Sequence, residues 1–246
     1  MNKLKIITIL WHEYIIFKNR FWGTTISLMI SPILYLIAFG WGLGNGMKID
    51  GMSYMNFVIP GIIAMSTMTI SFGTVANGIN ISRMYDKTFE EFVTSPINMA
   101  SYAIGKIIAS ASRGLYSAAL IIVLSLLFSK DFSIDLYSIF IIILNCLVFA
   151  ALGFAIGMII DSHADMSKFS SFIITPMSFL CGTFFPIDKM PFIIKQIVFL
   201  LPLTQTSVAL RRSSDVFVNP YIHPLILAIY FVILLLLGIK LCTKAE

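Results

Sequence analysis

The chain has 246 residues, of which 58% are hydrophobic and only 12% are charged, whereas globular proteins have about 25% charged residues. A mean hydropathy of +0.92 and several apolar stretches near twenty residues exclude a soluble protein and predict an all-α polytopic membrane protein. The net charge of +5 does not indicate nucleic-acid binding, because the Lys and Arg residues are scattered over short loops and do not form one patch.

The first twenty residues have the pattern of an amphipathic helix. Apolar side chains such as Leu4 and Trp11 recur at helical spacing on one side, while Lys5 and His12 lie on the other. The segment has no compact apolar centre followed by a small-residue cleavage site, so we expect no cleavable signal peptide. Residues 1–20 are therefore predicted to be an interfacial helix along the cytoplasmic headgroups.

Six stretches are apolar enough to span a membrane. The first contains Pro32 near its middle, where a kink is tolerated if neighbouring groups satisfy the freed carbonyl. The fourth carries Gly153 and Gly157, a spacing that lets two helices pack closely. The predicted spans are 21–43, 54–79, 104–128, 136–160, 169–185 and 223–241.

The most polar segment between these spans, residues 84–96, has the pattern of a short amphipathic helix. Phe89, Phe92 and Val93 fall on one face. Pro96 ends the helix, because proline lacks a backbone donor and disfavours helical geometry in the residue before it. The segment is either a solvated loop or a docking helix for a soluble subunit. Its other face carries Asp86, Lys87, Glu90 and Glu91.

One charge lies inside a predicted span. Arg113 follows Lys106 by two helical turns, on the cytoplasmic side of the third span. A charged side chain within the membrane is costly unless it reaches the interface or finds a partner. Arg113 is therefore either an anchor, which reaches headgroups or a nearby carboxylate, or a functional intramembrane charge.

The potential metal ligands are sparse. Asp161, His163 and Asp165 cluster in a predicted cytoplasmic loop, but no further His or Cys lies on the same side with convincing spacing. A solvated loop is the favoured interpretation, and we expect neither a metal nor a cofactor in this chain.

The region before the last span is the least regular. The apolar stretch 192–203 has about a dozen residues, too few to cross about 30 Å of hydrocarbon. Irregular backbone at membrane depth is tolerated only within protein or beside a water-filled cavity. Residues 186–210 are therefore predicted to form re-entrant or interfacial segments on the outer side.

The polar segment resembles a motif in the membrane subunits of type-2 ABC exporters. The run from Asp86 to Pro96, followed by Gly105-Lys106, is similar to the second cytoplasmic segment of that family. It departs from the family pattern at Lys87, where glycine is common, and at Phe89, where leucine is usual. The acidic helix and its proline stop are kept.

Two more motifs extend the resemblance over nearly the whole chain. The second span has Tyr, Phe and Pro60-Gly61 near its start, as family members often do. The outer region contains F-L-C-G-T-F-F-P, L-P-L-T and then Arg211, similar to the family's F-L-S-G-x-x-F-P, N-P-L-T and a later arginine. Cys181 replaces the usual serine and Leu201 the usual asparagine.

The resemblance implies that residues 1–246 form a single type-2 ABC transmembrane domain, with 84–96 as its coupling helix. The chain has no G-x-x-x-x-G-K-[ST] loop, so we expect no ATPase site of its own. ATP and magnesium would be bound by a separate ATP-binding subunit, and a second permease chain, identical or related, would complete the transporter. The residues that the resemblance assigns to the ATPase contact are Phe89, Glu90, Glu91, Phe92 and Pro96.

The charge distribution is compatible with a multi-pass protein of a prokaryotic cytoplasmic membrane with both termini inside. Six spans place eleven Lys or Arg residues inside and six outside, in agreement with the positive-inside tendency. Counting 192–203 as a seventh span also gives eleven to six, so charge does not decide between the two topologies. Length and the family resemblance favour six.

The predicted function is the permease subunit of an ATP-driven exporter, which moves an amphipathic drug, lipid or glycan-type substrate outward. The alternative is a secondary transporter driven by an ion gradient, which would have charges deep within its spans and internally repeated halves. Arg113 is the one candidate charge, and the sequence shows no internal repeat. An intramembrane enzyme would need a clustered nucleophile and base, which the sequence does not indicate.

Overall fold

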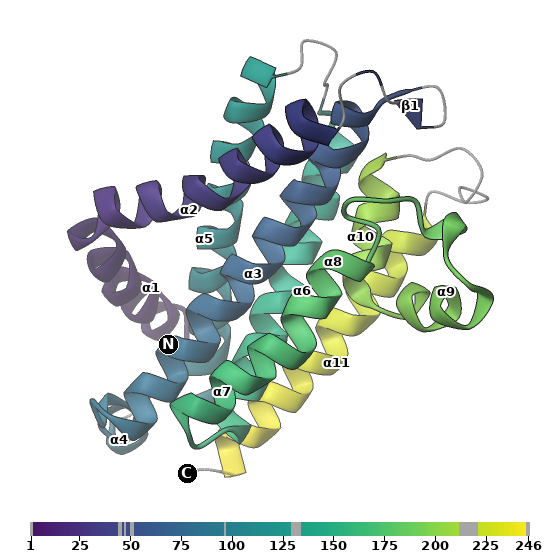
Figure 1. Ribbon diagram of the computed structural model, residues 1–246. Helices are drawn as coiled ribbons and strands as arrows, with labels where there is room; N and C mark the ends of the chain where they lie inside the picture. The colour runs from purple at the N-terminus through teal and green to yellow at the C-terminus, as the bar shows by residue number, and fades with distance from the viewer. Residues whose placement is uncertain are drawn as a thin grey trace.

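The computed structural model describes residues 2–43, 46, 48–49, 52–95, 97–128, 134–211 and 221–244, and Figure 1 shows that they form a bundle of long helices. The one pairing of strands within these residues joins β1 (Lys48–Ile49) to β2 (Met52–Ser53). Five described helices are long and apolar enough to cross a membrane, and a bent helix pair is a possible sixth. The predicted all-α polytopic fold is confirmed.

The first two helices meet at a sharp corner. Helix α1 (Asn2–Asn19) and helix α2 (Phe21–Tyr35) are joined by Arg20, and Figure 1 shows the corner projecting from one side of the bundle. Helix α2 continues into the π-helix η1 (Leu36–Leu43), so the helical run has the bounds predicted for the first span. Pro32 lies inside α2 and removes one donor from its ladder.

Helix α3 (Tyr54–Met84) is the centre of the bundle. It is predominantly buried, and it packs mainly against α5 (Met99–Phe128) and α6 (Leu136–Ile159). A Cβ atom on Gly153 would lie 2.5 Å from the Phe72 carbonyl oxygen, so glycine is required where α6 approaches α3. This confirms the close packing predicted for that face of the fourth span.

The chain after α6 differs from the predicted fifth span, 169–185. Helix α7 (His163–Phe169), the π-helix η2 (Ser170–Ile174) and α8 (Thr175–Leu180) follow one another directly. This run begins before the predicted span and ends at Leu180, because the chain then turns through Gly182 at a φ of 76°. The run is not among the helices that are apolar enough to span by composition, since it starts with polar residues.

The region before α11, which the sequence predicts to lie on the outer side, contains short helices. After η3 (Ile187–Lys189), α9 (Phe192–Phe199) and α10 (Pro202–Arg211) meet at an angle of 93°. With a rise of 1.5 Å per residue, neither arm is long enough to cross about 30 Å. The bend agrees with the short helices expected at 186–210, while their course relative to a membrane stays a prediction. Helix α11 (Ile222–Lys244) completes the bundle.

Helix α10 is polar and yet buried within protein. Its Thr206 hydroxyl donates to the Asn145 side-chain oxygen at 2.8 Å, and the amide of Asn145 donates to the Thr67 hydroxyl at 2.9 Å. All three side chains have no exposed surface. The hydrogen bond from α10 to Asn145 of α6, which continues to Thr67 of α3, thus offsets part of the cost of burying this polar helix.

Candidate functional site

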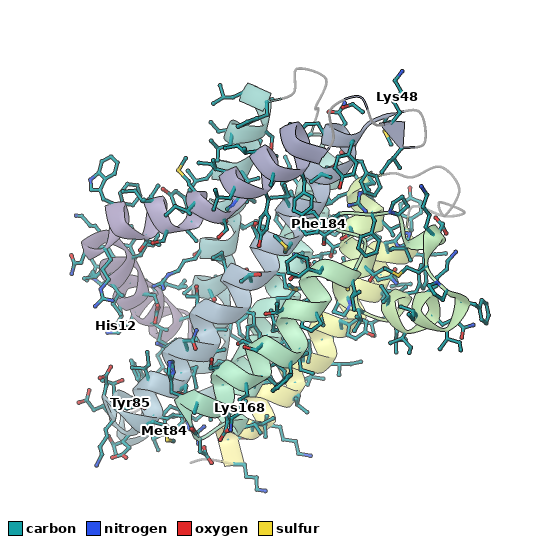
Figure 2. The ribbon with its side chains drawn as sticks, viewed as in Figure 1. His12, Lys48, Met84, Tyr85, Lys168 and Phe184 are labelled. Atoms are coloured by element: carbon teal, nitrogen blue, oxygen red, sulfur yellow. The ribbon has the colours of Figure 1, made fainter. Side chains whose placement is uncertain are left out.

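The predicted docking segment is a separate short helix at one end of the bundle. Helix α4 (Thr88–Thr94) lies where α3 ends and α5 begins, and Figure 2 shows Met84, Tyr85 and Lys168 at this same end. The end of α4 is marked by Ser95, whose hydroxyl donates to the Phe92 carbonyl at 2.7 Å. The predicted helix 84–96 is shorter in the structure. Helix α3 continues to Met84, and a turn separates it from α4, which begins at Thr88.

The two faces of α4 have different environments. Phe89 is buried, with its ring 5.8 Å from that of Tyr102 in α5, and Phe92 is half-buried, 5.0 Å from the same ring. Glu90 and Glu91 are exposed. The aromatic side chains thus attach α4 to the bundle, and the carboxylates are its accessible groups. Pro96, the fifth residue assigned to the ATPase contact, lies outside the described residues.

Helix α1 also reaches this end of the molecule. The His12 ring lies edge-on to Phe92, with centroids 6.3 Å apart. A Cβ atom on Gly105 would lie 2.9 Å from the Ile9 side chain, so α1 approaches α5 closely at this glycine. The N-terminal helix, α4 and the start of α5 therefore contact one another.

A carboxylate on α1 pairs with two cations on α5. Glu13 Oε1 lies 2.6 Å from Lys106 Nζ, and Glu13 Oε2 lies 2.8 Å from an Arg113 guanidinium nitrogen. Burial alone would raise the pKa of Glu13, but the two cations more than compensate, so the pKa lies below its usual value. Arg113, the predicted intramembrane charge, is in this structure an ion-paired residue in the middle of α5; whether it has a further function stays a prediction.

The sequence alone did not identify Glu13 as the partner of Arg113. Lys106 and Arg113 are seven residues apart and so lie on one face of α5. Glu13 is the one acidic residue in the sequence of α1. The available signal was a pair of cations on one helix face together with a carboxylate in the N-terminal helix. The sequence alone does not show that α1 packs against α5, which brings these charges together.

A polar cavity of about 540 Å³ opens beside this cluster, between α1, α3 and α5. Charged side chains of α1 and α5 line it, and α3 contributes Thr74 and Ser82 hydroxyls. It reaches Asp86 and Thr88, so it adjoins the start of α4. The charged residues of its lining are Glu13, Arg20, Asp86, Lys106 and Arg113.

Asp161 and Asp165, which were considered as metal ligands, pair with two different cations. Asp161 accepts from Arg83 at 2.8 Å, and Asp165 pairs with Lys168 at 2.8 Å. Arg83 also donates to the carbonyls of Gly157 and Met158 and so binds the end of α6. In the described part of the chain, no three His, Cys, Asp or Glu side chains form a group that could hold a metal ion.

At the opposite end, separate sequence motifs meet around one arginine. Arg211 donates to the carbonyls of Phe57 and Thr183, each at 2.9 Å, and its guanidinium lies 3.8 Å from the centroid of the Phe57 ring. A Cβ atom on Gly61 would lie 2.3 Å from the Thr183 oxygen. The Pro-Gly of the second span is thus where the outer motif and its arginine approach α3.

A second contact fixes the same outer turn. The Tyr54 hydroxyl donates to the Phe184 carbonyl at 2.9 Å, and the Phe184 ring lies 4.3 Å from that of Phe39. Figure 2 places Phe184 in the half of the bundle away from Met84 and Lys168. The outer motif is therefore held by both the first and the second predicted spans.

Comparisons with known proteins cover most of the chain. The sequence profile described as ABC-2 type transporter matches residues 5–213. Nodulation protein J of Rhizobium leguminosarum bv. viciae is 28% identical over 238 residues, which is 94% of this chain and 91% of that protein. Inner membrane transport permease YadH of Escherichia coli K12 is 27% identical over 186 residues, 74% of this chain and 72% of YadH.

Proposed function

The chain belongs to the ABC-2 type transporter family and is the membrane permease subunit of an ABC transporter; from this premise we propose that it exports its substrate and that α4 receives the ATP-binding subunit. The proposed cargo is an amphipathic drug, lipid or glycan-type molecule. The observation that carries the docking proposal is the division of α4 into a buried aromatic face and an exposed acidic face.

The contacts of α4 explain how it could transmit movement. A force on Glu90 or Glu91 would pass through Phe89 and Phe92 to Tyr102 of α5. The contact between Phe92 and His12 extends the connection to α1. Because packed elements move as units, closure of two ATP-binding subunits would shift α4, α1 and the start of α5 together.

The complete transporter in this proposal contains two permease chains and two ATP-binding subunits. Both termini lie on the cytoplasmic side of a prokaryotic plasma membrane, together with α4. The first, second and fifth membrane segments line the dimer interface and the pathway. Magnesium and ATP belong to the partner subunits, and this chain contributes force transmission and the path for the cargo.

The ion-gradient alternative depended on Arg113 as a charge available for coupling. In the structure Arg113 pairs with Glu13, and Glu13 also binds Lys106. This arrangement supports a structural link between α1 and α5 and does not favour a mobile ion site.

The test is affinity purification of the tagged chain in mild detergent with its candidate ATP-binding subunit. Combining Glu90→Arg with Glu91→Arg reverses the exposed charge of α4 and is expected to remove the ATPase from the purified complex. The matched control is Asp165→Arg with Asp188→Arg, because it makes the same change in net charge at two exposed carboxylates outside α4. Copurification unchanged by the α4 variant would contradict the docking proposal.

A further inference from the structure

The corner between α1 and α2 contains a second hollow. Its volume is about 600 Å³, and its lining combines two cations with amide, hydroxyl and aromatic groups. Arg20 belongs both to this hollow and to the polar cavity behind it. The residues that matter for recognition are Lys18, Asn19, Arg20, Trp22, Thr24 and Ser27.

The charged residues that line this hollow are all basic. Lys18 and Arg20 are exposed, and no carboxylate lines the hollow. Glu13, the acidic residue of α1, is engaged by Lys106 and Arg113. Within the described residues, Lys18 and Arg20 therefore have no ion-pair partner, and together they provide an anion-binding surface.

Near the hollow the residues change from charged to apolar, as is typical of a membrane interface. Charged residues end at Arg20, and the candidate span Phe21–Phe39 that follows contains none. Thr25 of α2 lies 2.9 Å from the Tyr116 hydroxyl of the adjacent helix α5. Tyr116 comes three residues after Arg113, the last charged residue of α5. Both helices thus change from charged to apolar at this level. Trp22 is 75% exposed here, as is typical of the aromatic belt at headgroup depth.

We propose that the α1–α2 corner is a binding site for the phosphate headgroup of an anionic phospholipid. Lys18 and Arg20 would contact the phosphate, and Asn19, Thr24 and Ser27 offer further donors. Trp22 lies beside the headgroup and glycerol region. The proposal rests on the proposed orientation, which puts α1 at the cytoplasmic leaflet. A lipid bound here would fix the corner from which α1 extends to α4.

The test is lipid binding to the purified full-length chain, followed by native mass spectrometry during titration. The probes are phosphatidylglycerol, zwitterionic phosphatidylcholine and inorganic phosphate. The variant is Lys18→Gln with Arg20→Gln. Its matched control is Lys240→Gln with Lys244→Gln, which removes the same charge at the end of another helix.

We expect saturable binding of phosphatidylglycerol that is at least about tenfold weaker in the corner variant and changes less than about threefold in the control. Equal weakening in both variants would show general attraction to basic residues and overturn the site. Equal binding of phosphatidylcholine, or displacement by inorganic phosphate, would also overturn it. Thermal unfolding without lipid should be the same in the variant and the native chain, which separates lost binding from lost folding.

The same preparations distinguish this proposal from the docking proposal. If the corner variant still purifies with the ATP-binding subunit but phosphatidylglycerol binding is unaffected, the lipid site alone is wrong. If the α4 variant retains the ATPase while the corner variant loses lipid, the docking proposal alone is wrong. The two results are independent because α4 does not line the corner hollow.

Discussion

Arg113 and Arg211 lie in different parts of the bundle and are stabilised by different contacts. Arg113 forms an ion pair with Glu13, a carboxylate brought by a peripheral helix. Arg211 donates to two backbone carbonyls and stacks on Phe57. An ion pair depends on one other side chain, whereas carbonyl contacts depend on the positions of two backbone segments. The contacts of Arg211 are therefore sensitive to backbone displacement, and those of Arg113 are sensitive to charge.

The largest effect is expected from Gly61→Ala. The added methyl group would lie 2.3 Å from the Thr183 carbonyl oxygen and 2.7 Å from the Arg211 guanidinium. Backbone would have to shift, at a cost of about 3 kcal/mol in the free energy of unfolding. The measurement is unfolding by denaturant in detergent.

The matched control for this change is Gly78→Ala in the same helix. Nothing lies within 4 Å of a Cβ atom at Gly78, and alanine has the higher helix propensity, so this variant should be as stable as the native chain or more so. Equal destabilisation by both alanines would show that the loss of stability arises in helix α3 itself and not from the contacts of Gly61 with Thr183 and Arg211.

A smaller effect is expected from Glu13→Gln in the ion-pair cluster of Glu13, Lys106 and Arg113. Lys106 and Arg113 would keep their charges and lose their carboxylate, at a cost of about 2 kcal/mol, less than for a fully buried pair because the three side chains retain some exposure. Glu91→Gln, at an exposed carboxylate, is the control.

The pH dependence tests the same cluster. Because the pKa of Glu13 is lowered by folding, its contribution to stability is complete above the usual value of 4.5 and is lost as the pH falls below it. Unfolding of the native chain should therefore show a loss of stability below about pH 4.5 that Glu13→Gln lacks. Identical pH profiles for the two proteins would contradict the ion-pair assignment.

The smallest effect is expected from Asp188→Asn. Asp188 pairs with Lys195 at 2.5 Å, but both side chains are about half exposed, and such pairs contribute about 0.5 kcal/mol or less. Unfolding measurements at low and high salt should differ little between this variant and the native chain. A loss comparable to that of Glu13→Gln would contradict the distinction between exposed and buried ion pairs made here.

The fold was predictable where hydrophobicity alone determines an element. The long apolar helices α3, α5, α6 and α11 follow from composition and length, and the short outer helices follow from the limited apolar stretch at 192–203. The fifth span was less predictable, because Gly182 at positive φ ends the apolar run before Phe185. Hydropathy reports burial or lipid contact, and it does not register where backbone geometry interrupts a helix.

Of the candidate site, only helix α4 was predictable from the sequence. The face of α4 that carries Phe89 and Phe92 follows from helical spacing, and the structure places both rings against Tyr102. The assignment of these two residues to an ATPase contact stays a prediction, and their burial makes Glu90 and Glu91 the accessible members of the set. Contacts over long sequence separations, such as Glu13 with Arg113, require the tertiary fold.

Lys87, the residue that precedes α4, has a φ of 54°, and among the described residues it is the one non-glycine residue with a positive φ. Glycine, the residue that the family resemblance leads us to expect at this position, adopts a left-handed backbone without steric cost. A lysine costs about 1 kcal/mol more than glycine in this conformation, but it has fewer alternative backbone states. The joint between α3 and α4 is consequently strained, but it has fewer alternative conformations than a glycine joint would have. If α4 receives the ATP-binding subunit as proposed, less of its movement would be lost at this joint.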